Sequence, residues 1–128
     1  MQIRMKWGKI MDGIATYQDN TVSTQSKGRL IAMLYDRAVK FMVLAIMEME
    51  KKNHKAKDRH INKALDIIDE LNAALDMDSN SKIARNLRKK YNFMSKHLSL
   101  ANIKGDSQMV CDVIKQMEEL NKIWKVFN

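Results

Sequence analysis

The stretch Leu30–Met49 reads LIAMLYDRAVKFMVLAIMEM and contains neither glycine nor proline. Most of its residues favour the α-helix. At about 100° per residue, two apolar stripes lie side by side along this helix. The first stripe, enough for a core-facing side, comprises Leu30, Leu34, Ala38, Phe41 and Ala45. The second stripe comprises Ile31, Tyr35, Val39, Met42, Ile46 and Met49.

So much apolar surface has two explanations. The helix is either central to its domain, or it offers its second face to a partner. A membrane span needs about 20 residues with few or no charges, and Asp36, Arg37 and Lys40 interrupt the run too early. We therefore expect a helix with more apolar surface than a small bundle needs and no insertion into a membrane.

The composition of the chain indicates a single all-helical domain. The 128 residues include four glycines and no proline, so helix breakers are scarce. The single cysteine, Cys111, cannot form an internal disulfide and fits a reducing compartment. Met1–Trp7 is basic, but no apolar signal-peptide segment follows it. These features predict a cytoplasmic protein.

The N-terminal residues differ from the rest of the chain. Residues 1–25 show no sustained period and include Gly8 and Gly13. We expect them to form an N-terminal arm, with at most a short helix near Ile14–Tyr17. Residues 26–128 are then one domain.

Four helices are predicted in this domain. Ser26 is the expected N-cap of the first, because its hydroxyl can accept a hydrogen bond from an amide of the first turn. The helices are expected at about Ser26–Lys52, Lys55–Met77, Lys82–Ile103 and from the cap Asp106 to the chain end, with Gly105 ending the third. Short connections between long helices predict an antiparallel four-helix bundle.

Regular three- and four-residue steps identify the inward positions of the last three helices. The second helix has Ile61, Ala64, Leu65, Ile68, Leu71 and Leu75. The third has Ile83, Leu87, Tyr91, Met94, Leu98 and Ala101. The fourth has Val110, Val113, Met117, Leu120, Trp124 and Phe127.

The net charge of +8 is unevenly distributed. Ser79–Gly105 contains seven basic residues and no acidic one, whereas Lys55–Asp78 contains four basic and six acidic residues. Two neighbouring helices with complementary faces would explain this pattern, and so would a nucleic-acid footprint. In the second case the contacts would come from Lys82, Arg85, Arg88, Lys89 and Lys96.

No pattern of residues indicates catalysis, a metal or a cofactor. None of the three histidines belongs to the Glu-x-x-His pairs that a di-iron bundle uses. Cys111 has no evident base beside it.

The methionines are more informative about function, because methionine recurs on surfaces that accept apolar helices of varying shape. Those of the first long helix, Met33, Met42, Met47 and Met49, are either core residues or part of a groove for an amphipathic segment.

Several motifs in order resemble one family. They are Gly13-Ile14-x-x-Tyr17 with Asn20-x-Val22, Leu30-Ile31-x-Met33-Leu34-Tyr35-Asp36, Lys63-Ala64-x-x-Ile67-Ile68-x-x-Leu71 with Leu75-Asp76, Ile83-Ala84-x-Asn86-Leu87-x-x-x-Tyr91-x-Phe93-Met94, and Leu98-x-x-Ala101-Asn102 with Asp106, Val113 and Trp124. The chain resembles the flagellar secretion chaperones (FliS family) from about Gly13 to Trp124.

The resemblance implies a non-enzymatic, cytoplasmic chaperone without a cofactor. Such a protein would hold the C-terminal segment of flagellin, prevent premature polymerisation and assist export through the flagellar export apparatus. The second apolar stripe, Ile31, Tyr35, Val39, Met42, Ile46 and Met49, is then the expected flagellin-binding groove. Ile14 and Tyr17 would form a latch that the export apparatus contacts. On this reading the basic third helix binds no nucleic acid; the alternative is a basic helical nucleic-acid-binding protein.

Overall fold

The computed structural model describes residues 24–75 and 81–125. Within these ranges the chain forms four helices: α2 (Thr24–Glu50), α3 (His54–Ala73), α4 (Lys82–Lys104) and α5 (Ser107–Lys125). The predicted all-helical fold is confirmed.

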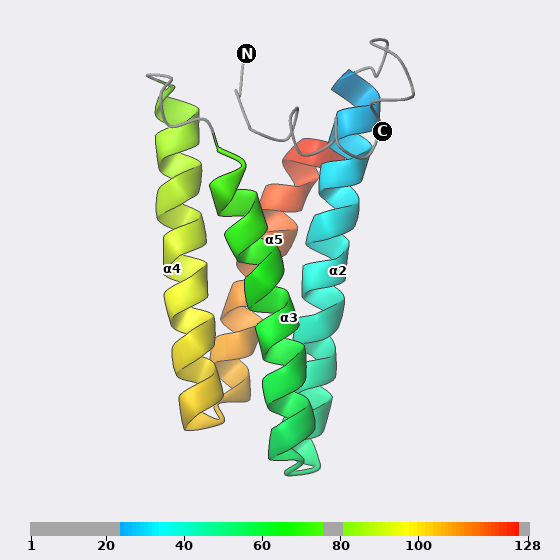
Figure 1. Cartoon of the computed structure of the whole chain (residues 1–128), viewed down its shortest axis with the longest axis vertical. Coiled ribbons are helices and arrows are strands. Elements are labelled where there is room, and N and C mark those ends of the chain that lie inside the picture. Colours follow the sequence, from blue (N-terminus) through cyan, green and yellow to red (C-terminus); the bar gives the residue numbers. More distant parts are fainter. Residues whose placement is uncertain (1–23, 76–80, 126–128) are drawn as a thin grey trace.

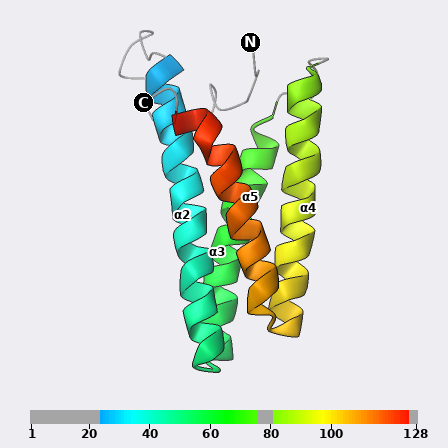
Figure 2. The same cartoon turned by 180° about the vertical axis from the view of Figure 1, so that it is seen from behind.

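Consecutive helices run in opposite directions and form a four-helix bundle (Figure 1). The helix α2 packs against α3 and α5, and α4 packs against the same two neighbours. The view from behind shows α5 crossing obliquely between α2 and α4 (Figure 2). The bundle therefore has α2 and α4 at opposite corners, so their outer faces point away from each other.

Side-chain caps define where α3 and α4 begin. The side chain of Asn53 accepts a hydrogen bond from the amide of Ala56 at 3.3 Å, and Ser81 accepts one from the amide of Ala84 at 3.2 Å. Each cap satisfies an amide that has no partner inside its helix.

The connection between α4 and α5 follows the sequence prediction. Gly105 has a left-handed backbone with φ of 63°, and its amide bonds the last carbonyls of α4. Glycine adopts this conformation at little cost because it has no Cβ. The carboxylate of Asp106 then accepts hydrogen bonds from the amides of Gln108 and Met109, at 2.9 and 3.3 Å. Both predicted boundary roles are confirmed.

Two predicted helix boundaries are wrong. The helix α2 begins at Thr24, so Ser26 lies inside it rather than at its N-cap. The helix α3 ends at Ala73 rather than near Met77. Leu75, just beyond the end of α3, has only 1% of its surface exposed. Burial of this side chain stabilises a chain path that leaves the helix early, since tertiary packing outweighs helix propensity.

The core is built from the predicted inward positions of α3, α4 and α5. All those with described side chains are buried except Leu65 and Ile83, which are half-buried against the core edge. Ile67 is also buried although the predicted stripe omitted it. Trp124 and Phe127 lie outside the residues whose side chains are described.

The core face of α2 lies between the two predicted stripes rather than on the first alone. The fully enclosed residues come from both, namely Ile31, Tyr35, Ala38, Met42 and Ala45. Leu30, Leu34 and Phe41 of the first stripe are only partly buried. Because α2 packs against two helices, its buried arc is centred on the bundle axis and takes the inner edge of each stripe.

A hydrogen bond between two tyrosine hydroxyls crosses the core from α2 to α4. Tyr35 and Tyr91 have no exposed surface, and their hydroxyl groups bond each other. Burial raises the pKa of Tyr91 well above its usual value, and the neighbouring Tyr35 hydroxyl raises it further. Burial therefore keeps the Tyr91 hydroxyl protonated at neutral pH, and either hydroxyl can act as the donor in the bond.

Polar contacts also join neighbouring helices near the two ends of the bundle. The Nζ of the buried Lys57, in the first turn of α3, donates to the carbonyl of Asn102 in the last turn of α4 at 2.9 Å. A cation is favoured at a helix C-terminus because unpaired carbonyls gather there. Towards the other end, the buried Asn121 of α5 donates to the carboxylate of Asp36 of α2 at 2.8 Å.

We predict that stability falls as the pH rises above about 10. Tyr91 keeps its proton in the folded state while the unfolded chain loses it, so its contribution is complete below about pH 10 and is lost as the pH rises through the folded pKa. Between the two pKa values, each pH unit lowers the free energy of unfolding by about 1.4 kcal/mol. Urea titrations at several pH values above 9 should show a shallower decline for Tyr91→Phe than for wild type. If the free energy of unfolding declines equally with pH in both proteins, the raised pKa of Tyr91 does not contribute to stability.

Candidate partner-binding surfaces

The structure divides the predicted flagellin groove into an enclosed and an accessible half. Ile31, Tyr35 and Met42 point into the core and have at most 3% of their surface exposed. Val39, Ile46 and Met49 are partly buried and pack against the core edge. In this conformation only the partly buried residues offer surface to a partner. The enclosed residues pack in the core beneath them.

Beside the accessible half, α2 exposes further apolar side chains. Val43 and Met47 have 44% and 47% of their surface exposed. Residues three or four apart are neighbours on a helix surface, so Val43 lies next to Val39, Ile46 and Met47. We call these four residues, Val39, Val43, Ile46 and Met47, the α2 patch. Single exposed apolar residues are ordinary, but a contiguous group on successive turns indicates a binding surface.

Neither predicted stripe contained Val43 or Met47. The methionine content of the segment had indicated a possible groove at Met47, whereas nothing singled out Val43. The sequence does not show which side of α2 faces the core, and this direction determines which apolar side chains remain in solvent. Met33 is also exposed, at 54%, but it stands more than two turns before Val43, with Asp36, Arg37 and Lys40 between them.

Ile14 and Tyr17, the predicted latch, lie outside the described residues. The structure therefore leaves their contacts with the bundle as a prediction.

The basic face of α4 is largely accessible. Lys82, Arg85, Lys89 and Lys96 are exposed, and none makes an ion pair with another residue of the described ranges. Arg88 differs, because it is half-buried and its guanidinium donates to the carbonyl of Asn72 on α3 at 3.4 Å. Four of the five residues considered for nucleic-acid contact thus point outward.

Groups typical of enzyme sites do not gather in the part of the chain that the structure describes. No cluster of three or more His, Cys, Asp or Glu side chains there has the spacing of a metal site. The ring of His60 stacks on Phe41 at 6.4 Å between centroids, and His97 stacks on Phe93 at 5.2 Å. Cys111 is a half-buried free thiol. These side chains serve as packing groups in the bundle.

A helical bundle that presents an apolar patch on its longest helix is a candidate protein-binding domain. Comparison with known proteins identifies the family of the chain. Residues 10–128 match the family profile described as Flagellar protein FliS.

Three relatives named Flagellar secretion chaperone FliS are similar in sequence to this chain over most of its length. The protein of Bacillus subtilis (strain 168) is 33% identical over 116 residues, which cover 91% of this chain and 86% of the relative. That of Vibrio cholerae serotype O1 is 34% identical over 106 residues, covering 83% and 78% of the two chains. That of Salmonella typhimurium is 33% identical over 108 residues, covering 84% and 80%. The chain belongs to the FliS family of flagellar secretion chaperones, as the motifs predicted.

None of the helices in the described ranges is long and apolar enough to cross a membrane. This finding includes α2, whose charged residues had argued against a span.

Two methionines of α2 should respond differently to truncation. Met42 has no exposed surface and Met47 has 47%. We predict that Met42→Ala lowers the free energy of unfolding by about 2–5 kcal/mol, because it leaves a cavity in the core. Met47→Ala should change it by less than about 0.5 kcal/mol. Urea denaturation measures both values, and comparable losses would show that Met47 is not a surface residue.

Proposed function

We propose that this protein is a non-enzymatic, cytoplasmic chaperone that holds the C-terminal segment of flagellin, prevents its premature polymerisation and assists its export. Membership of the FliS family supports the chaperone role. The α2 patch supports the binding role, because it is an apolar surface that the bundle itself leaves uncovered.

The chemistry of the patch suits an amphipathic partner segment. Such a segment places apolar side chains at helical spacing into an apolar surface. Met47 can adjust to different partner side chains because its chain is flexible and its sulfur polarisable. Exposed Lys40 and Glu50 on the same helix provide polar contacts beyond the apolar centre. The partner would contact the α2 patch and Met49 directly.

The enclosed residues of the predicted groove have a different role in this proposal. Ile31, Tyr35 and Met42 hold α2 against the rest of the bundle, and so fix the direction in which the patch faces. Replacing them would weaken binding through loss of the fold. Replacing surface residues of the patch would weaken binding alone.

Titration with a peptide of the flagellin C-terminal segment tests this function. Met47→Asp places a carboxylate on the α2 patch, and we predict at least a tenfold loss of affinity because a buried unpaired charge is costly. Met33→Asp is the matched control, since Met33 has similar exposure but lies outside the patch. The control should bind like wild type. Equal losses in both variants would place the binding surface elsewhere.

Salt separates this function from the nucleic-acid alternative. Apolar anchors should make peptide affinity change little between low and moderate salt. Phosphate contacts by a basic helix would instead make DNA affinity fall steeply. The same titrations with a DNA duplex at two salt concentrations provide the comparison. Tight, salt-sensitive DNA binding without peptide binding would overturn the chaperone proposal.

The N-terminal arm is the proposed regulator of the patch. The residues that precede α2 include Ile14 and Tyr17 in the family spacing, and a segment this short, interrupted by Gly8 and Gly13, does not form a stable helix alone. We propose that these apolar side chains cover the patch in the free protein, leave when flagellin binds, and then contact the export apparatus. Covering the patch would also limit self-association.

Deletion of residues 1–20 tests the arm. We predict unchanged or tighter flagellin-peptide binding, more self-association and poorer delivery to the export machinery. Calorimetry, light scattering and a secretion assay measure the three effects, with the full chain as control. If the deletion changes none of the three, the arm is not a latch.

A further inference from the structure

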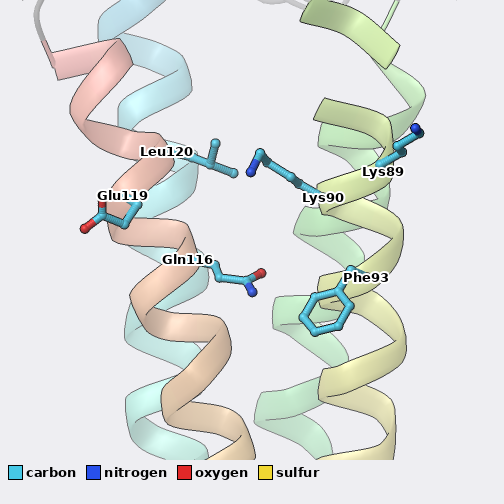
Figure 3. A pocket seen from close by; sticks show the side chains of 6 residues that line it. All are labelled: Lys89, Lys90, Phe93, Gln116, Glu119 and Leu120. Carbon is cyan, nitrogen blue, oxygen red and sulfur yellow. The ribbon is translucent and has the colours of Figure 1, made fainter. Parts of the chain in front are cut away.

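A groove separates α4 from α5 on the side of the bundle opposite α2 and α3. The two helices join at Gly105 and Asp106 and diverge from that connection (Figure 2). The groove encloses about 530 Å³ and is lined by Lys89, Lys90, Phe93, Gln116, Glu119 and Leu120 (Figure 3). The hydrogen bond from Asn121 to Asp36 holds the same part of α5 towards α2, and so keeps it away from α4.

The groove presents an aromatic ring that is held in place. Phe93 is 49% exposed, and its ring stacks on His97 with 5.2 Å between centroids and 20° between planes. The Nε2 of His97 lies 3.2 Å from a carboxylate oxygen of Asp112 on α5. Because the histidine is bonded across the two helices, it supports the phenyl ring at the edge of the groove. Leu120, largely buried on α5, provides an apolar surface opposite.

The charge around the groove is positive and uncompensated. The helix α4 contains no acidic residue. Lys89 and Lys90 are exposed and form no ion pair with the described residues, and the side chain of Lys90 extends from α4 towards Leu120 (Figure 3). The one acidic residue of the lining, Glu119, pairs with Lys122 of its own helix at 3.4 Å.

We propose that the α4–α5 groove docks an acidic amphipathic segment of a partner protein. An aromatic or aliphatic side chain of the segment packs between Phe93 and Leu120, and its carboxylates pair with Lys89 and Lys90. This site goes beyond the proposed flagellin-binding function, because α2 and α4 occupy opposite corners of the bundle and the α2 patch faces away from the groove.

The observations favour a peptide over other occupants. A nucleic acid satisfies the lysines but has no aliphatic anchor for the space beside Leu120. Among the residues whose side chains are described, Phe93 is the only exposed Phe, Tyr or Trp ring available for base stacking. A bilayer surface does not enter a concave groove between two helices. The first nine residues of this chain contain Arg4, Lys6 and Lys9 and no acidic residue. They would be repelled by Lys89 and Lys90.

A peptide display library of random 16-residue sequences, panned on the full-length protein, tests the proposal. Peptides that bind wild type but not Phe93→Ala should be rich in Asp and Glu around an aromatic or aliphatic residue. Their affinity, measured by fluorescence anisotropy, should fall at least tenfold in Phe93→Ala and in Lys90→Glu. Raising the salt concentration should weaken binding, because two of the contacts are ionic.

Two matched variants control for general effects. Ile103→Ala removes an exposed apolar side chain of α4 outside the groove lining, and Lys55→Glu reverses an exposed charge on α3. Both should bind the selected peptides like wild type. The proposal is overturned if the controls lose as much affinity as the groove variants, if no acidic peptides are selected, or if a single-stranded oligonucleotide displaces the selected peptides.

The flagellin peptide provides the last comparison. It should bind together with a selected acidic peptide, and Met47→Asp should weaken only the flagellin peptide. Mutual displacement would show that the groove belongs to the flagellin site and would overturn a second docking surface. Failure of flagellin binding at the α2 patch, with acidic peptides still lost in Phe93→Ala, would contradict the proposed function and leave this inference standing.

Discussion

The surface of this bundle depends on how much of one helix its neighbours can cover. A helix in a four-helix bundle contacts two neighbouring helices and buries about half of its circumference. The helix α2 is apolar over a wider arc than that. Its inner residues, such as Tyr35 and Met42, complete the core, and Val43 and Met47 remain in solvent. The exposed apolar surface is thus a geometric result of placing an all-round apolar helix at a corner.

A few polar contacts determine how the helices stand around this core. The bond between Tyr35 and Tyr91 links the diagonal pair α2 and α4 through the centre. Lys57 closes one end by capping the last turn of α4. The bond between Asn121 and Asp36 positions α5 beside α2. Hydrogen bonds have strict distance and direction requirements, whereas apolar packing tolerates rearrangement, so these contacts restrict how the helices can pack.

Local sequence patterns encode only part of each candidate surface. The apolar excess of α2 is a property of its residues, so a binding role for this helix could be predicted. Its binding face could not, since Ile31 and Val39 belong to the same stripe and differ in burial. Likewise, the charge of α4 was evident from its lysines. That Lys90 and Phe93 line one groove with Leu120 depends on the divergence of α5, which no local pattern encodes.

The helical fold, the caps Gly105 and Asp106, and the inward positions of α3, α4 and α5 could all be predicted from the residues alone. So could the family, through motifs distributed along nearly the whole chain. These features depend on local conformational preference and on apolar periodicity, both of which are readable from neighbouring residues. Packing between the helices determines which arc of α2 faces the core, where α3 ends, and how α5 lies between α2 and α4. Those outcomes come from contacts between residues far apart in the chain, such as Tyr35 with Tyr91, and their free energies arise only when the helices pack together.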